Sequence, residues 1–172
     1  MNEVLRTLEE RRSIRSFKAE QVPEDVLKQI LEAGTYAPTG MGAQSPVMVV
    51  VQDQEMIGKL SKLNAEVMGT DSDPFYGAPT VVVVLADKSR PTCVEDGALV
   101  MGNLMIAAKS LEIGSCWIHR AREVFAGEEG KKILQTWGLD PEKYIGVGHC
   151  LLGYAKEPGK AKPRKEDYIK FV

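Results

Sequence analysis

The sequence has few cysteines and no long hydrophobic run. Its 172 residues include three cysteines, at the widely spaced positions 93, 116 and 150. An odd number at such spacings disfavours a disulfide framework and indicates reduced thiols in a cytoplasm. The longest apolar run, near residues 98–108, is interrupted by Gly102 and Asn103, so we expect no membrane-spanning segment. No apolar segment follows the first methionine, so we also expect no signal peptide and a cytoplasmic protein.

An excess of charge of one sign is also absent. The chain carries 22 Lys and Arg against 24 Asp and Glu, for a net charge of −2, and 44% of its residues are hydrophobic. These values are typical of an ordinary globular protein, and the length predicts a single domain over residues 1–172. Because nucleic-acid binding needs a broad basic surface, we do not expect a nucleic-acid partner.

The motifs of several common enzyme classes are missing. No G-x-G-x-x-G segment follows a predicted strand, and no P-loop occurs, so the two common nucleotide cradles are absent. No G-x-S-x-G elbow supports a serine hydrolase. Cys116 and His119 are three positions apart and His149 and Cys150 are adjacent, and on strands both spacings point to opposite faces. We therefore expect core cysteines and no metal site.

The hydrophobic patterns predict alternating helices and strands, which indicates an α/β or α+β protein. One helix, over residues 95–112, is apolar on nearly every face and should be buried on all sides. The remaining predicted helices cover residues 2–12, 22–34, 54–68 and 127–137, and the predicted strands cover residues 47–53, 80–87, 115–121 and 144–155. The carboxylate pairs at residues 95–96 and 128–129 are interpreted as helix starts, where negative charge favours the helix dipole.

Positive charge is concentrated at both ends of the chain. Arg11, Arg12 and Arg15 lie within five positions, together with Ser13 and Ser16. Two explanations stay open: surface cations at the end of the first helix, or an anion site that combines guanidinium and hydroxyl donors. A second basic cluster follows in the tail, at residues 162, 164 and 165. If the tail folds back beside residues 11–15, both clusters would converge on one phosphate.

The loop over residues 37–46 is rich in glycine and proline and contains Thr39, Gly40 and Gln44. It is either a plain connection between a helix and a strand or a close backbone approach to a flat ligand.

Four segments together resemble the FMN-dependent nitroreductase family, in that family's order and spacing. They are RRSIRSF (11–17), VPEDVLKQILEAGTYAPTG (22–40), DGALVMGNLMIAAKSLEIGSCWI (96–118) and LLGYAKEPGKAKPRK (151–165). The resemblance implies an α+β fold, with a mixed sheet flanked by helices, made as an intertwined homodimer. Each of two FMN sites would be built from both subunits at the interface. The apolar helix would form the dimer core, and an arm over about 156–172 would lie on the partner.

The resemblance also implies a set of FMN-binding residues. Arg11 and Ser13 would hold the phosphate, with Arg12 nearby and with Lys162 and Arg164 joining from the tail. Other expected contacts are Arg15 at the N1/C2 edge of the ring, Trp117, Ile118 and His119 passing near N5, and Thr39, Gly40 and Gln44 from the partner subunit. His119 is either a proton relay or a structural histidine.

Two positions depart from the family's loop. Gly42 stands where an asparagine often contacts the pyrimidine edge, and Pro46 stands where a tryptophan is usual.

The implied activity is a ping-pong cycle in which NAD(P)H passes hydride to flavin N5 and a nitroaromatic, quinone or similar small-molecule acceptor then receives it. Three alternatives remain: another flavin reaction such as dehalogenation, ene reduction or flavin reduction, a non-catalytic flavin electron-transfer protein, and an anion-binding module without flavin.

Overall fold

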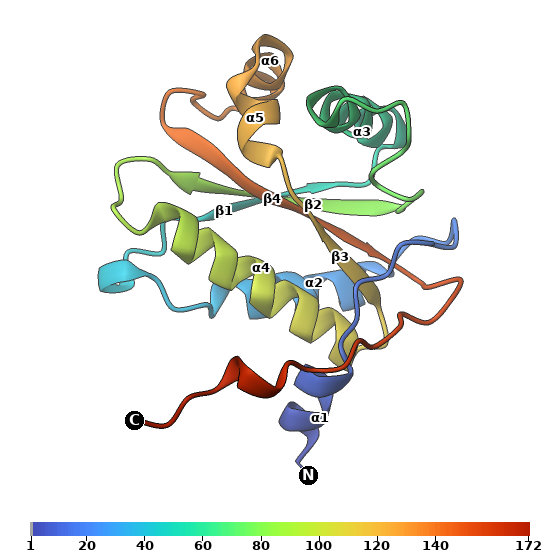
Figure 1. Ribbon diagram of the computed structural model, residues 1–172. Helices are drawn as coiled ribbons and strands as arrows, with labels where there is room; N and C mark the ends of the chain where they lie inside the picture. The colour runs from blue at the N-terminus through green and yellow to red at the C-terminus, as the bar shows by residue number, and fades with distance from the viewer. Residues whose placement is uncertain (1) are drawn as a thin grey trace.

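In the computed structural model, which describes residues 2–172, four strands form one antiparallel sheet in the order β1-β2-β4-β3 (Figure 1). The strands are β1 (Val47–Val51), β2 (Thr80–Asp87), β3 (Gly114–Ile118) and β4 (Tyr144–Gly153). β2 and β4 lie in the middle of the sheet and β1 and β3 form its edges. The predicted mixed sheet is therefore antiparallel in its named strands, and parallel pairing within residues 2–172 occurs as an isolated bridge between Ser13 and Ser115.

Helices cover both faces of this sheet (Figure 1). α3 (Gln54–Met68), α5 (Ala121–Ala126) and α6 (Glu128–Thr136) lie over one face, and α2 (Glu24–Thr35) and α4 (Cys93–Ser110) lie over the other, with α1 (Glu3–Glu10) beyond them. Because successive side chains of a strand point to opposite faces, Val81 and Val83 of β2 enter the core under α3 and α5, whereas Val82 and Val84 enter the core above α4. None of the helices within residues 2–172 is both long and apolar enough to cross a membrane.

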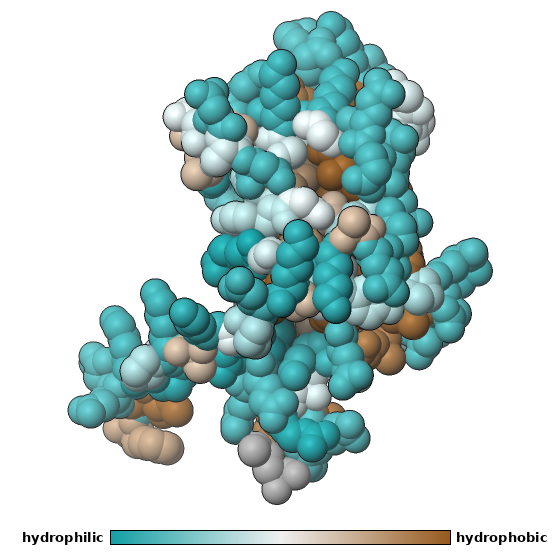
Figure 2. Space-filling model, turned by 90° about the vertical axis from the view of Figure 1, so that its right-hand side faces the viewer, coloured by the Kyte–Doolittle hydropathy of each residue, from teal (hydrophilic) through white to brown (hydrophobic). Residues whose placement is uncertain are grey.

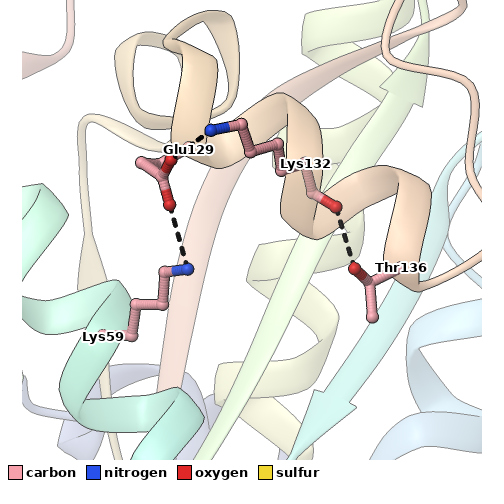
Figure 3. Close-up of polar contacts among 4 residues, drawn as sticks. All are labelled: Lys59, Glu129, Lys132 and Thr136. Atoms are coloured by element: carbon pink, nitrogen blue, oxygen red, sulfur yellow. Dashed lines mark hydrogen bonds and ion pairs between the residues drawn. The ribbon is translucent and has the colours of Figure 1, made fainter.

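An ion pair joins two of the helices above the first face, α3 and α6. Glu129 of α6 accepts from Lys59 of α3 at 3.1 Å and from Lys132 of its own helix at 2.7 Å (Figure 3). Thr136, one turn further along α6, donates its hydroxyl to the carbonyl of Lys132 at 3.0 Å (Figure 3). All three charged side chains are exposed, so these ion pairs add little to the stability of the protein.

One prediction about local structure depends on a second subunit and one is wrong. Within the single chain α4 is buried on one side, since Leu99 is 47% exposed and Met105 and Ile106 are half-buried, so its burial on all sides stays a prediction for the homodimer. The strand predicted over residues 115–121 ends at Ile118, because Arg120 adopts a left-handed conformation (φ 72°) that no strand continues through.

The two ends of the chain run side by side next to β3 and β4. Ile14 N–H donates to the Ser115 carbonyl at 2.9 Å. Lys18 N–H donates to Tyr154 at 2.8 Å and Lys156 N–H to Ser16 at 2.9 Å. The later residues of the arm, including η2 (Glu166–Tyr168), extend away from the body, where Figure 2 shows apolar residues near the end of the projection.

Candidate functional site

A cavity of about 500 Å³ lies between the N-terminal segment and the C-terminal arm. Its lining consists of residues 11–16 and, from the arm, residues 157–160, 162 and 164. We call it the cationic pocket. The structure therefore brings together the two basic clusters at opposite ends of the sequence, because the backbone pairing of residues 16–18 with residues 154–156 aligns the segments that carry them.

Most of the charged side chains that line the cationic pocket are cations. Its unpaired cations are Arg11, Arg15, Lys160, Lys162 and Arg164. Within residues 2–172, no carboxylate lies within ion-pair distance of any of them. One acidic residue, Glu157, is part of the lining. Like charges gathered in one concave site repel each other, so the pocket is complementary to an anion.

Arg12 differs from its neighbours in the pocket. Its Nη1 donates to the carbonyls of Glu9 at 2.6 Å and Arg11 at 2.7 Å, at the end of α1. The last carbonyls of a helix lack partners within the helix, and a guanidinium there satisfies them and favours the helix dipole. Arg12 therefore stabilises the end of α1, as predicted for a surface cation at the end of the first helix. It is also part of the pocket lining.

The rest of the pocket is formed by serine hydroxyls and by the backbone of the arm, which lies close to the N-terminal segment. Ser13 and Ser16 are half-buried in its lining. A β-carbon added to Gly159 would overlap Cβ of Arg12, so glycine is required for the arm to lie this close to the N-terminal segment. No motif in the sequence assigns a role to Gly159 or Lys160, and the one signal that points to them is a glycine beside a basic cluster.

The buried cysteines do not supply reactive thiolates. Burial raises the pKa of the Cys116 thiol, and the nearby cations Arg15 and Arg11 offset part of that effect. Burial raises the pKa of Cys150 to about 12. Because the thiolate is the reactive form, both thiols are inert core groups at neutral pH, as predicted.

Trp117, Ile118 and His119 lie along the outer edge of the sheet and do not line the cationic pocket. The Ser115 carbonyl accepts from Ile14 on this edge, so the backbone N–H and C=O of Trp117, two residues on, face the same side. His119 is exposed, and its carbonyl accepts from the buried Asn64 amide at 2.7 Å.

Thr39, Gly40 and Gln44 lie in the loop around η1 (Gly40–Gly42), away from the cationic pocket of the same chain. Thr39 and Gln44 line a separate cavity of about 130 Å³ with residues of α2, β1 and α4. The structure thus divides the expected site residues into the cationic pocket, the edge of β3 and this loop. The expected meeting of the loop with the pocket requires a second subunit and stays a prediction.

The fold and the pocket define an α+β protein whose two chain ends form one cationic pocket beside an antiparallel sheet. A model of the nitroreductase family matches residues 8–154, and the chain belongs to this family.

Relatives and solved structures agree with this assignment. The chain is 38% identical to the FMN reductase (NAD(P)H) of Bacillus subtilis, over 95% of this chain and 70% of that protein. A nitroreductase of Bacteroides fragilis with bound FMN superposes with a TM-score of 0.92 at 30% identity and covers all of both chains. An FMN-bound nitroreductase of Desulfitobacterium hafniense gives a TM-score of 0.89 at 28% identity, covering 100% of this chain and 99% of that one.

Proposed function

We propose that the cationic pocket holds the phosphate of FMN and that the protein is an NAD(P)H-dependent oxidoreductase of the nitroreductase type. The FMN-bound structures with the same fold and the FMN reductase relative support both parts of this proposal. When bound, FMN supplies hydride transfer from NAD(P)H through its N5 atom to a nitroaromatic, a quinone or a similar acceptor.

The observation that carries the proposal is the group of cations without carboxylate partners in one pocket. A phosphate monoester is a small dianion whose oxygens accept bidentate guanidinium bonds and hydroxyl bonds. Arg11, Lys162 and Arg164 supply the charge, and Ser13 supplies a hydroxyl. The donor set therefore fits this end of FMN.

The remaining residues bind and orient the ring in this proposal. Arg15 is exposed at the pocket and would supply a cation to the N1/C2 edge of the ring. The outward-facing backbone N–H and C=O of Trp117 would offer a donor and an acceptor at the edge of β3, although the carbonyl also accepts a weak bond from the Cys116 thiol at 3.8 Å. The exposed imidazole of His119, next to this edge, is the proposed proton relay.

We also propose a homodimer, because one chain leaves the site and its apolar surface incomplete. Leu99 of α4 and Val4, Leu5 and Leu8 of α1 are between 47% and 65% exposed. In a dimer this surface would be covered, and Thr39, Gly40 and Gln44 would reach the flavin of the partner subunit.

The first experiment is anaerobic reduction of the purified protein. The protein should carry the yellow flavin spectrum, which NADH or NADPH should bleach, and an added nitroaromatic or quinone should restore it. Bleaching without turnover of any small acceptor would favour electron transfer instead. A colourless protein that ignores added FMN would contradict the flavin assignment.

Arg11→Ala tests the pocket directly. Loss of a charged hydrogen-bonding partner should weaken FMN binding by about 2 kcal/mol, or roughly thirtyfold. The unfolding temperature of the apoprotein should stay nearly unchanged, because the substitution relieves repulsion among the pocket cations. Fluorescence titration and thermal unfolding measure the two quantities. Arg122→Ala, an exposed arginine on α5, is the matched control and should change neither. Equal losses of binding and stability in Arg11→Ala would make the arginine structural.

A further inference from the structure

Asp96 is a carboxylate in the first turn of α4 with only 3% of its surface exposed. Its neighbour Glu95 is exposed on the same turn. Both side chains share the favourable interaction with the helix dipole, so that interaction explains why an acid stands here but not why one of the two is buried. Removing a carboxylate from water is costly unless specific donors replace the solvent.

The donors to Asp96 come from two sides. Gly40 N–H donates to Oδ1 at 2.9 Å, from the loop before β1. The Thr92 hydroxyl donates to Oδ2 at 3.2 Å, from the residue before α4. Within residues 2–172, no Lys, Arg or His side chain pairs with this carboxylate. A β-carbon on Gly40 would overlap the Thr92 hydroxyl, so glycine is required for this approach.

The loop that Asp96 holds has a conformation that L-residues rarely adopt. Met41 and Gln44 have left-handed backbones, with φ 57° and φ 48°, and Gly42 between them has φ 64°. Met41 and Gln44, which carry a β-carbon, each cost on the order of 1 kcal/mol in this conformation and persist only where the surroundings hold them, whereas Gly42 adopts it freely. The turn's own bonds are local, such as Gln44 N–H to Thr39 Oγ1 at 3.0 Å. The Gly40–Asp96 bond instead joins the turn to a helix 56 positions away in the sequence.

We propose that Asp96 is a positioning residue for the flavin. Through Gly40 it holds the loop over residues 39–44 in the conformation that presents the exposed Gln44 to the ring bound by the partner subunit. This inference rests on the proposed function. It adds that a buried residue outside the lining of the cationic pocket sets FMN affinity through Gln44 rather than through general stability.

The inference is tested by a double-mutant cycle between Asp96 and Gln44, with the dissociation constant of FMN measured by titrating the apoprotein. Asp96→Ala should weaken FMN binding about tenfold, and so should Gln44→Ala. If Asp96 acts through Gln44, the double variant should bind no more weakly than Gln44→Ala alone. Losses that multiply in the double variant, or no loss in either single variant, would overturn the inference.

Two controls separate positioning from folding. Asp96→Asn should restore most of the affinity, because its amide can accept from Gly40 N–H and donate to the Thr92 hydroxyl. Glu95→Ala removes a charge from the same helix turn and should leave FMN affinity unchanged. Equal loss in Glu95→Ala, or no rescue by Asp96→Asn, would refute the proposed role.

If Asp96→Ala does not fold, Gly40→Ala tests the same contact from the loop side: it should reproduce the tenfold loss, and combining it with Gln44→Ala should weaken FMN binding no further, whereas a direct contact of Gly40 with the flavin would make the losses multiply. Unchanged affinity in Gly40→Ala would count against the inference. A wild-type protein that binds no FMN would instead refute the proposed function itself.

Discussion

Arg11 and Arg12 are adjacent in the sequence and differ in their contacts. Arg12 donates from Nη1 to two carbonyls at the end of α1, so part of its hydrogen-bonding capacity is used within the fold. Arg11 pairs with no carboxylate in the part of the chain that the structure describes, and its side chain lines the cationic pocket. Sequence patterns cannot separate two such neighbours, because the difference depends on where each guanidinium points.

Gly159→Ala should detach the arm from the N-terminal segment. The new methyl group would overlap Cβ of Arg12, so the arm must move and carry Lys160, Lys162 and Arg164 away from the pocket. We expect FMN affinity to fall about tenfold, equivalent to the loss of about 1.4 kcal/mol. The measurement is FMN titration of the apoprotein.

The control for Gly159→Ala is Gly58→Ala, in α3, where a β-carbon meets no atom within 4 Å. This change should leave FMN affinity intact and stabilise the helix by up to about 1 kcal/mol. If both variants bind FMN as the wild type does, the close approach of Gly159 does not shape the pocket.

His149 makes the protein sensitive to acid. It is fully buried between the rings of Phe75 and Phe125, and burial lowers its pKa from 6.5 to about 4. The unfolded chain therefore takes up a proton more readily than the native protein. The stability contributed by neutral His149 is complete above pH 6.5 and is lost as the pH falls toward 4. The loss over this range should be about 3 kcal/mol.

Urea unfolding at a series of pH values measures this effect. His149→Leu introduces an apolar side chain of similar size that cannot take up a proton, and it should abolish most of the slope between pH 6.5 and 4. His119→Gln changes the exposed histidine and should preserve the slope. An unchanged slope in His149→Leu would assign the acid sensitivity to other groups.

At the scale of the elements, α3 depends on its N-terminal cap more than on its surface ion pair. Asp53 accepts from Met56 N–H at 2.8 Å at the start of the helix. Asp53→Ala should therefore lower the free energy of unfolding by about 1 kcal/mol. Glu129→Gln breaks the exposed pairs with Lys59 and Lys132 and should have little effect, least of all at high salt. Denaturant unfolding of both variants checks this order, and a larger loss from Glu129→Gln would reverse it.

At the scale of the whole molecule, the arm leaves apolar side chains in solvent. Tyr168, Ile169 and Phe171 are 81%, 71% and 96% exposed in the single chain. A chain that ends at Arg164 keeps the pocket cations but lacks this apolar end. In the proposed homodimer the truncation should raise the dissociation constant of the dimer at least tenfold, as measured by analytical ultracentrifugation. Lys170→Ala keeps the apolar residues and should dimerise as the wild type does, and equal dimerisation of the truncated chain would contradict a role for the arm.

Local patterns were sufficient for most elements. The run of β-branched residues in β2 and the helical spacing in α3 predicted residues 80–87 and 54–68, and the structure has both elements with these bounds. Helix α4 shows the limit: its apolar composition predicts burial on all sides, but one chain supplies neighbours on one side only and leaves Leu99 exposed, so the composition does not say which molecule covers the other side. The resemblance of separated segments to a family was also readable from the sequence, because it depends on residue identity and order.

The sequence by itself determined the α+β class, the family and the two basic clusters, since periodicity, composition and motif order are properties of the chain read along its length. Only the tertiary structure decided that the two clusters share one pocket and that Gly159 permits the approach of the arm. It also decided that Arg12 bonds the carbonyls at the end of α1 and that Asp96 holds the loop at Gly40. Each of these depends on which side chains and carbonyls meet after folding. Contacts such as Gly40 to Asp96 join positions 56 residues apart, and no local pattern records such a distance.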